Sequence, residues 1–421
     1  MSSLWVESER AAPPLRLQES HRFPGVARPH VRASYAEGLR SGETSPVLAM
    51  LAQRGISPGQ IAAAAKGARD QGVTVGEYLT GNGYVSADTL YCSVAQHLGM
   101  PFLGGKLPLR ENIDPYATAK HGVAPIVQNS ARGARILVAP RGPALERLMS
   151  GVYGPENLRA PLAVTTPERL ENALRTHAAA TIAAEASEAL GKVDPSLSVR
   201  SGPTSGESWI ALVCLVALAA IALNFPLLGG TCLALAFFAA ILLRLFSVAM
   251  SFGPPPAAGP PLADANLPVY TIIVALYREE AVIAQLLAAL EQLDYPHAKL
   301  DTKIVVEADD VETIAALGAS RGRLPFEIVI APPGAPRTKP RALNVALPFA
   351  RGTLTCVFDA EDKPERSQLR RAAEIFARSI ANLACLQARL VVDNYRDNWL
   401  TRGIMAQTPP AARNDRARWP R

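Results

Sequence analysis

One stretch of the chain is too apolar for the surface of a water-soluble protein. Across residues 209–252 the only charged side chain is Arg244. The motif NFPLLGG at 224–230 interrupts this stretch, because proline and paired glycines break a helix. The apolar runs on either side, 209–223 and 231–252, are close to the ~20 residues that a membrane-spanning helix needs. We therefore expect two transmembrane helices joined as a hairpin.

The charges around the hairpin predict its orientation. Lys192, Arg200 and Arg244 lie toward its outer ends, and the turn carries no charge. By the positive-inside rule, both outer ends and both soluble domains then face the cytoplasm. Linkers predicted at 183–208 and 253–266 bracket the hairpin. Two other arrangements remain open, namely a single transmembrane helix preceded by a buried helix and a soluble protein with a very hydrophobic core.

The composition agrees with a membrane-associated protein of two or three domains. Of 421 residues, 49% are hydrophobic and 19% charged, and the net charge of +6 suits a membrane surface or anionic ligands. We predict no nucleic-acid partner. The five cysteines are scattered without metal-ligand spacing, so buried thiols are favoured over disulfides or zinc. Residues 1–42 and 403–421 have no periodic apolar pattern and are predicted to be disordered.

Residues 45–102 contain a weak internal repeat. VLAMLAQRGIS at 47–57 aligns with VGEYLTGNGYVS at 75–86, and a helix-like stretch follows each copy. Beyond the repeat, the runs ILVAP and LAVTTP alternate with PALERLMSG and ERLENALRTH. This alternation of strand-like and helix-like runs predicts a small α/β subdomain.

The region after the linker alternates strands and helices. The predicted strands are VYTIIVAL at 269–276, DTKIVVEADD at 301–310, FEIVIAP at 326–332 and LTCVFDAED at 354–362. Such alternation is typical of an α/β domain with a mostly parallel sheet. In these sheets, ligands bind beyond the carboxyl ends of the strands.

Carboxylates gather at these predicted strand ends. The candidate residues there are Tyr277, Glu279, Asp309, Asp310, Asp359, Glu361 and Asp362. Carboxylates without His or Cys suit a hard cation, Mg²⁺ or Mn²⁺, although a solvated turn has the same composition. Arg337, Lys339 and Arg341 form a basic segment that could meet a diphosphate or form a solvated loop. Glu280 and Asp301 are interpreted as helix-start or surface charges.

Four motifs in order resemble glycosyltransferase family 2, in its membrane-bound, cellulose-synthase-like subgroup. They are YREE at 277–280, EADDVET at 307–313, RTKPRALN at 337–344 and VFDAEDKPE at 357–365. The resemblance implies a GT-A nucleotide-sugar-binding domain, incomplete here at 267–402, preceded by the transmembrane hairpin and a small α+β domain.

The resemblance also implies a donor, most often a UDP-sugar, and three sets of residues that bind it. They are Tyr277, Glu279, Asp309 and Asp310 for the nucleoside, Lys339 and Asn344 for the diphosphate, and Asp359, Glu361 and Asp362 for Mg²⁺ or Mn²⁺. In the first acidic motif, either Asp309 or Asp310 would hold the uracil or the ribose. The second acid of the metal motif is Glu361, where the family has Asp.

Residues 43–182 resemble the MshEN-type domain, through Gly76-Glu77-Tyr78-Leu79, Gly83 and the segment 98–102. Some members bind cyclic di-GMP through a repeated Arg-Leu-Gly element. Here the corresponding triplets are Thr74-Val75-Gly76 and Pro46-Val47-Leu48, and both arginines are missing. The arginine contacts to guanine and phosphate would be lost with them. A degenerate regulatory domain is the alternative.

Two family elements do not occur in this sequence. They are the Thr/Ser-Glu-Asp element, whose Asp is the general base, and the Gln-x-x-Arg-Trp element, so no catalytic base is assigned. We expect a gene product truncated near residue 403 and inactive as it stands. The predicted function is a membrane-anchored inverting glycosyltransferase, or a fragment of one, with a polysaccharide or lipid acceptor at a bacterial-type inner membrane. The alternative is a regulatory subunit that binds a nucleotide sugar or a cyclic dinucleotide without catalysis.

Overall fold

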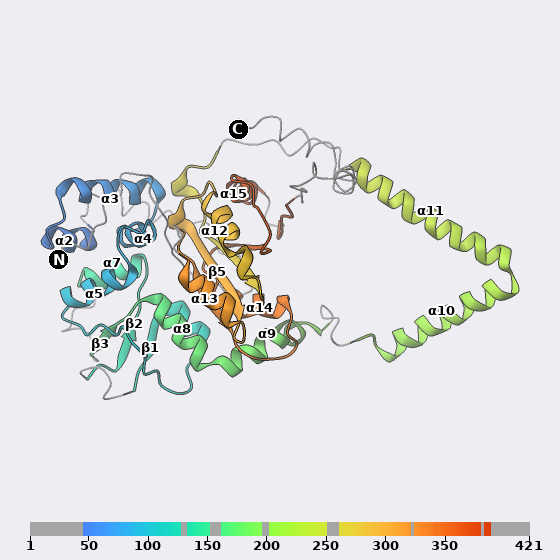
Figure 1. Ribbon diagram of the computed structural model, residues 1–421, viewed down its shortest axis with the longest axis horizontal. Coiled ribbons are helices and arrows are strands. Elements are labelled where there is room, and N and C mark those ends of the chain that lie inside the picture. Colours follow the sequence, from blue (N-terminus) through green and yellow to red (C-terminus); the bar gives the residue numbers. More distant parts are fainter. Residues whose placement is uncertain are drawn as a thin grey trace. The chain divides into compact units, whose positions relative to one another are not determined.

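The chain divides into two compact units (Figure 1). In the computed structural model the described residues are 45–127, 133–151, 161–195, 202–250, 261–320, 324–379 and 383–388. The first unit combines residues up to Glu188 with Leu262–Ile380, and the second contains Ala189–Pro261 and Ala381–Arg421. The ends predicted to be disordered, 1–42 and 403–421, lie outside the described residues, as does most of the 253–266 linker.

The predicted repeat forms two helix pairs. The helices are α2 (Pro46–Gln53), α3 (Pro58–Gln71), α4 (Val75–Gly81) and α5 (Ala87–His97). The aligned residues take equivalent places: Val47 and Val75 are both buried, and so are Leu51 and Leu79. Gly55 and Gly83 both have positive φ, at 82° and 65°, where glycine is favoured. The repeat is confirmed as a structural repeat.

The predicted α/β subdomain follows. Its elements are α6 (Pro115–His121), β1 (Val123–Pro125), β2 (Ile136–Val138), α7 (Pro143–Met149), β3 (Leu162–Val164) and α8 (Pro167–His177). Strand β2 pairs antiparallel with β1 and parallel with β3. Leu137 and Ala163 of this sheet pack with Leu170 and Leu174 of α8. A helix on one sheet face encloses this small core.

The second sheet has four strands, all parallel, in the order β6-β5-β4-β7. The strands are β4 (Tyr270–Leu276), β5 (Leu300–Glu307), β6 (Glu327–Ala331) and β7 (Leu354–Phe358). Helices connect them: α12 (Ile283–Glu291), α13 (Val311–Ala319) and α14 (Lys339–Ala346), with α15 (Gln368–Arg378) after β7. Short 3₁₀ turns precede or connect these elements: η3 (Asp264–Asn266) before β4, then η4 (Glu280–Val282), η5 (His297–Lys299) and η6 (Leu347–Phe349). The predicted parallel α/β sheet is confirmed, and all four carboxyl ends lie along one edge.

Helices cover both faces of this sheet. On one face, Ile272, Val274 and Ile304 pack with buried leucines of α12, α13 and α15. On the other face, Ile273, Val305 and Val329 pack with α14 and with α9 (Ala179–Val193). The predicted linker 183–208 is therefore helical as far as Val193, because Ile182 and Ala186 bury their side chains against the sheet.

Buried ion pairs also join α8 to the parallel sheet. Lys303 of β5 is fully buried, and its Nζ lies 2.6 Å from Glu327 Oε2, 3.4 Å from Glu171 Oε2 and 3.6 Å from Asp301 Oδ1. The Asp301 carboxylate also accepts a 2.5 Å hydrogen bond from Arg351 Nε. The interpretation of Asp301 as a surface charge is therefore wrong, because this carboxylate is fully buried among cations.

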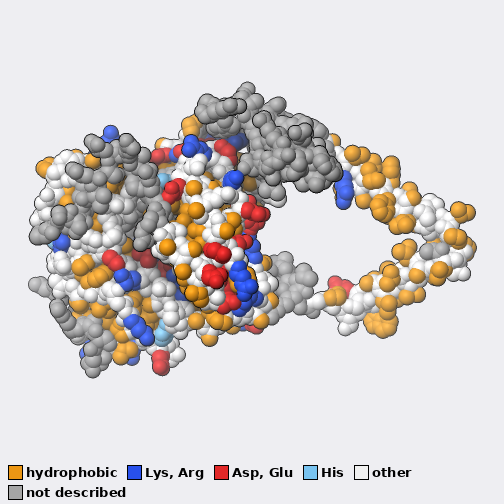
Figure 2. Space-filling view, in the orientation of Figure 1, with side chains coloured by type: hydrophobic (Ala, Val, Ile, Leu, Met, Phe, Trp, Pro, Cys, Tyr) orange, Lys and Arg blue, Asp and Glu red, His pale blue; other side chains and the backbone are white. Residues whose placement is uncertain are grey.

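Two exposed apolar helices form most of the described part of the second unit. They are α10 (Ser205–Asn224) and α11 (Pro226–Met250), and Figure 2 shows apolar side chains along both. Pro226 begins α11, where its missing N–H costs nothing, so the predicted break is reduced to Phe225. Over Pro226–Phe246, α11 is long and apolar enough to cross a membrane, whereas the apolar part of α10 is shorter. One span is supported, and the two-span hairpin stays a prediction.

Candidate functional site

A cavity of about 460 Å³ opens at the carboxyl edge of the parallel sheet. The polar residues that line it are Tyr277, Glu279, Glu307, Arg337, Thr338, Lys339, Asp359 and Glu361. They come from the segments after β4 and β7, from the end of β5 and from the start of α14. Parallel strands bring these distant segments to one edge, where α/β proteins bind ligands. Five of the nine predicted site residues line this cavity: Tyr277, Glu279, Lys339, Asp359 and Glu361. A sixth, Asp309, forms an ion pair with Arg337, which also lines it.

Asp359 and Lys339 form an ion pair in the lining of this cavity. Lys339, the first residue of α14, forms an ion pair with the Asp359 carboxylate directly after β7. Both side chains are about half exposed, at 41% and 59%. The Asp359 carboxylate is therefore already stabilised by one cation, the Lys339 ammonium group. Glu361, two residues later in the chain, lines the same cavity.

These carboxylates fit a hard divalent ion that binds together with phosphates. In the part of the chain that the structure describes, no three His, Cys, Asp or Glu side chains are grouped into a complete metal site. Mg²⁺ in nucleotide sites usually takes only one or two protein carboxylates, with phosphates and water completing its shell. Asp359 and Glu361 satisfy that smaller requirement, and their oxygen chemistry suits Mg²⁺ or Mn²⁺.

Tyr277 combines an open aromatic ring with neighbouring cations. Its side chain is 39% exposed. Arg337 Nη1 donates to the Tyr277 hydroxyl at 3.3 Å and to Asp309 Oδ2 at 2.9 Å. The hydrogen bond to Tyr277 and the charge of Asp309 raise the pKa of the Arg337 guanidinium. The Arg278 guanidinium lies 5.2 Å from the centre of the same ring. This edge of the cavity therefore offers an aromatic face and positive charge together.

Asp310 has a different task from its neighbour Asp309. Its buried carboxylate caps α13, accepting from the backbone N–H of Thr313 at 3.2 Å, and accepts from the N–H of Arg278 at 2.5 Å. Arg278 has φ 57°, a strained value for a residue with a Cβ. Burial raises the pKa of Asp310, but these hydrogen bonds outweigh it and bring the pKa below its usual value. Asp310 thus holds the turn that presents Tyr277.

Two other predicted residues lie apart from the cavity lining. Asn344 donates from Nδ2 to the carbonyl oxygen of Ala186 in α9 at 2.9 Å. Asp362 accepts from the backbone N–H of Asp359 at 2.8 Å, so its carboxylate closes the turn after β7. Both contacts hold neighbouring backbone in place, and both assignments to the ligand stay predictions.

A buried pair at the floor of the cavity was not anticipated from the sequence. Glu307, the last residue of β5, is 5% exposed, and Arg341 Nη1 lies 3.4 Å from its Oε1. Arg341 also donates to the carbonyl oxygen of Pro332 and is 2% exposed. Its guanidinium is therefore occupied inside the protein, and the expectation that it meets a diphosphate does not agree with this burial. The acid at the end of a buried strand was the only sequence signal for this pair.

Residues 268–417 match the family model described as "Glycosyltransferase like family 2". This range contains the whole parallel sheet and every residue that lines the cavity. Residues 268–417 are a glycosyltransferase family 2 domain. The resemblance noted from the four motifs is confirmed at this level. The cellulose-synthase-like subgroup and the MshEN-type domain remain predictions.

Curated proteins similar to this domain carry the name beta-monoglucosyldiacylglycerol synthase. The protein from Synechocystis sp. is 34% identical over 158 residues, which are 36% of this chain and 33% of the relative. The protein from Trichormus variabilis is 30% identical over 145 residues, 34% of this chain and 30% of the relative. The chain thus spans about a third of the length of the curated relatives it matches.

A solved structure is also similar over part of the chain. It is the mannosyltransferase PcManGT from Pyrobaculum calidifontis in complex with GDP-Man and Mn²⁺, with 28% identity and a TM-score of 0.30. The similarity covers 38% of this chain and 44% of that chain. A TM-score this low establishes no shared geometry.

Proposed function

We propose that this protein is a membrane-anchored glycosyltransferase whose family 2 domain binds a nucleoside-diphosphate sugar at the carboxyl edge of its parallel sheet. The observation that carries the proposal is the cavity in which Tyr277, Glu279, Lys339, Asp359 and Glu361 converge. The match of the surrounding domain to glycosyltransferase family 2 supports it independently.

The nucleoside end of the donor is assigned to Tyr277 and its neighbours. The exposed Tyr277 ring, beside Arg337, can stack on a nucleobase. Such stacking is open to every base, because every base has a π face. Glu279 and Asp309 supply acceptors for base or ribose donors, while Asp310 keeps the turn in place. The sugar of the donor and the kind of base are left open by these groups, and a UDP-sugar is our working choice.

The diphosphate end is assigned to the charged groups opposite. Lys339 and Arg337 provide the positive charge that two phosphates require, and Lys339 exchanges part of its contact with Asp359 for a phosphate oxygen. Asp359 and Glu361 would hold Mg²⁺ or Mn²⁺. Such an ion neutralises charge on the departing nucleoside diphosphate. Around it, Lys339 keeps the diphosphate oriented, and Arg341 keeps the Glu307 carboxylate neutralised at the cavity floor.

For the acceptor we propose a glycolipid or another lipid with a free hydroxyl. The names of the curated relatives, which refer to a glucosyl-diacylglycerol, support this class. Helix α11, long enough to span a membrane, would keep the domain beside lipid substrates. The corresponding location is the cytoplasmic membrane, with the family 2 domain on the cytoplasmic side.

The test uses the whole chain purified in detergent, with UDP-glucose or GDP-mannose, Mn²⁺ and diacylglycerol in mixed micelles. Transfer of radioactive sugar to lipid, or hydrolysis of the donor, supports an enzyme. Binding of the donor without turnover instead supports the regulatory alternative. If neither donor binds with or without Mn²⁺, the proposed donor site is refuted. A Glu312→Gln variant, on the exposed first turn of α13, serves as the control for altered surface charge.

A further inference from the structure

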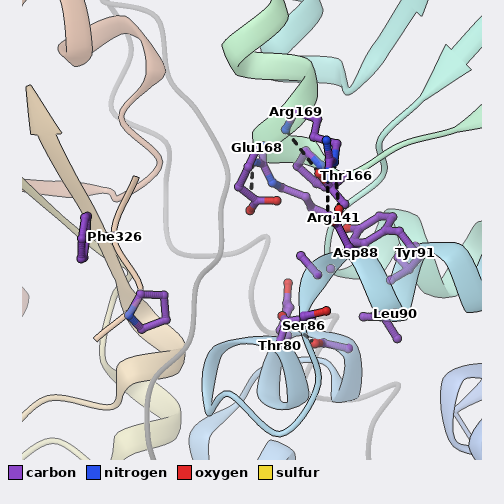
Figure 3. A pocket seen from close by; sticks show the side chains of 17 residues that line it. Thr80, Ser86, Asp88, Leu90, Tyr91, Arg141, Thr166, Glu168, Arg169 and Phe326 are labelled. Atoms are coloured by element: carbon purple, nitrogen blue, oxygen red, sulfur yellow. Dashed lines mark hydrogen bonds and ion pairs between the residues drawn. The ribbon is translucent and has the colours of Figure 1, made fainter. Parts of the chain in front are cut away.

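A second cavity of about 460 Å³ is lined mainly by residues between 76 and 169 and shares no lining residue with the first cavity (Figure 3). The close-up shows side chains from α4, α5 and α8 and from the segment before α7 directed toward a common hollow, with Phe326 across it. Cavities of this size hold small organic ligands. None of the roles assigned above uses it.

Unpartnered polar atoms face one another in this cavity. Arg141 Nε and Nη2 and Glu168 Oε2 are buried atoms without a hydrogen-bond partner. Arg141 Nη2 lies 3.8 Å from Glu168 Oε1, which is beyond hydrogen-bond distance. The other terminal nitrogen of Arg141 is occupied by Glu171 at 2.7 Å. Buried donors and acceptors are nearly always paired, so these atoms call for a partner that accepts from the guanidinium and donates to the carboxylate.

The charges of the lining select against a phosphate ligand. Two cations, Arg141 and Arg169, face three carboxylates, Glu77, Asp88 and Glu168. Arg169 is already paired with Asp88 at 2.6 Å, and this hydrogen bond lowers the pKa of the Asp88 carboxyl. A phosphate would have to displace that pair and approach two further acids. A neutral ligand rich in hydroxyl groups meets no such repulsion.

Apolar surface completes the cavity. Leu90, Leu145 and Phe326 line it beside the polar groups. A sugar ring carries C–H groups on its faces and hydroxyl groups around its edge, and each hydroxyl both donates and accepts. Apolar walls with a few convergent polar groups match that division.

We propose that this second cavity binds a neutral saccharide, with Arg141 donating to its hydroxyl oxygens and Glu168 accepting from its hydroxyl groups. The site is separate from the donor site and does not depend on the proposed transfer reaction. It would let the N-terminal part respond to free or lipid-linked sugar.

Saturation-transfer NMR on the whole chain in detergent tests this proposal. The probes are D-glucose, D-mannose and maltose, recorded with excess UDP and diamagnetic Mg²⁺ so that the donor site is blocked. We expect a saccharide signal that survives this competition. Glu168→Gln should lower the affinity about tenfold, because a neutral amide oxygen replaces the charged acceptor.

The matched control is Glu312→Gln, which replaces an acid at the same position in the first turn of another helix. It should leave the saccharide signal unchanged. A signal that UDP and Mg²⁺ abolish, or that Glu168→Gln leaves intact, would place the sugar elsewhere and overturn the proposal. The absence of any saccharide signal overturns it as well, and so does binding of cyclic di-GMP in this cavity in preference to sugars.

Discussion

Asp310→Ala separates a ligand-binding role from a structural one at the first acidic motif. The carboxylate caps α13 and accepts from the strained Arg278 backbone. Loss of an N-cap costs about 0.5–2 kcal/mol. Loss of a hydrogen bond to a charged group costs about 1.5–3 kcal/mol. One carboxylate makes both contacts, so the two losses are not fully additive. We therefore expect the free energy of unfolding to fall by about 2–4 kcal/mol in total.

Urea unfolding in detergent, followed by far-UV circular dichroism, measures that loss. Asp309→Ala is the matched control, because its half-exposed ion pair with Arg337 is screened by solvent and should contribute little to stability. Asp310→Asn is the conservative variant. Its amide oxygen can replace only one of the two acceptors, because the carboxylate uses Oδ1 toward Thr313 and Oδ2 toward Arg278. Its stability should therefore lie between those of wild type and Asp310→Ala, and its UDP affinity should be largely kept. If Asp310→Ala keeps full stability and loses UDP binding, Asp310 is a ligand residue and the structural reading is refuted.

Three further predictions concern the buried charges and the diphosphate. Lys303→Met should lower the free energy of unfolding by about 3–5 kcal/mol, because it removes the buried cation that Glu327, Glu171 and Asp301 share, whereas exposed Lys66→Met should change it little; equal unfolding curves for the two variants contradict this. The lowered pKa of Asp310 means that its ionised form stabilises the fold above the usual value of 3.8. As the pH falls through that value toward the lower folded pKa, wild type should lose stability relative to Asp310→Asn, and parallel pH profiles in unfolding experiments would argue against it. Lys339→Ala should weaken UDP binding about tenfold and uridine binding far less, because only UDP carries the diphosphate that Lys339 contacts. Calorimetry measures both affinities, and equal losses would show that Lys339 does not bind the diphosphate.

The sequence was sufficient for the sheet and for most of its ligand edge. Continuous β-branched runs such as VYTIIVAL identify strands buried on both faces, and their alternation with helices fixes a parallel order. Carboxyl ends then share an edge, so Tyr277, Lys339 and Asp359 could be grouped although up to 82 residues separate them. This inference needs only topology, which local patterns determine well.

The side-chain roles within that edge were harder to predict. Asp309 and Asp310 look alike in sequence, and only the path of the chain decides which carboxylate turns inward to cap α13. Asn344 contacts Ala186, 158 residues earlier, so its surroundings depend on where α9 packs. The same holds for Asp301, whose buried partner Arg351 is 50 residues away. Long-range partners of this kind leave no local signal.

Helix α9 shows the same limit for a whole element. Its sequence, AATIAAEASEALGKV, is rich in alanine, and the linker predicted at 183–208 begins within it. Alanine favours helix without indicating a partner. The burial of Ile182 and Ala186 on the parallel sheet becomes evident only when the two parts of the first unit are seen together.

The affinity of the protein for UDP, measured by calorimetry with and without Mn²⁺, tests most directly whether the carboxyl edge of the sheet is a donor site. Wild type should bind UDP more tightly with Mn²⁺ than without it. Asp359→Asn should lose most of that metal-dependent gain, and Asp70→Asn, an exposed control on α3, should keep it. An Asp359→Asn protein with the same metal-dependent gain as wild type would contradict the donor site.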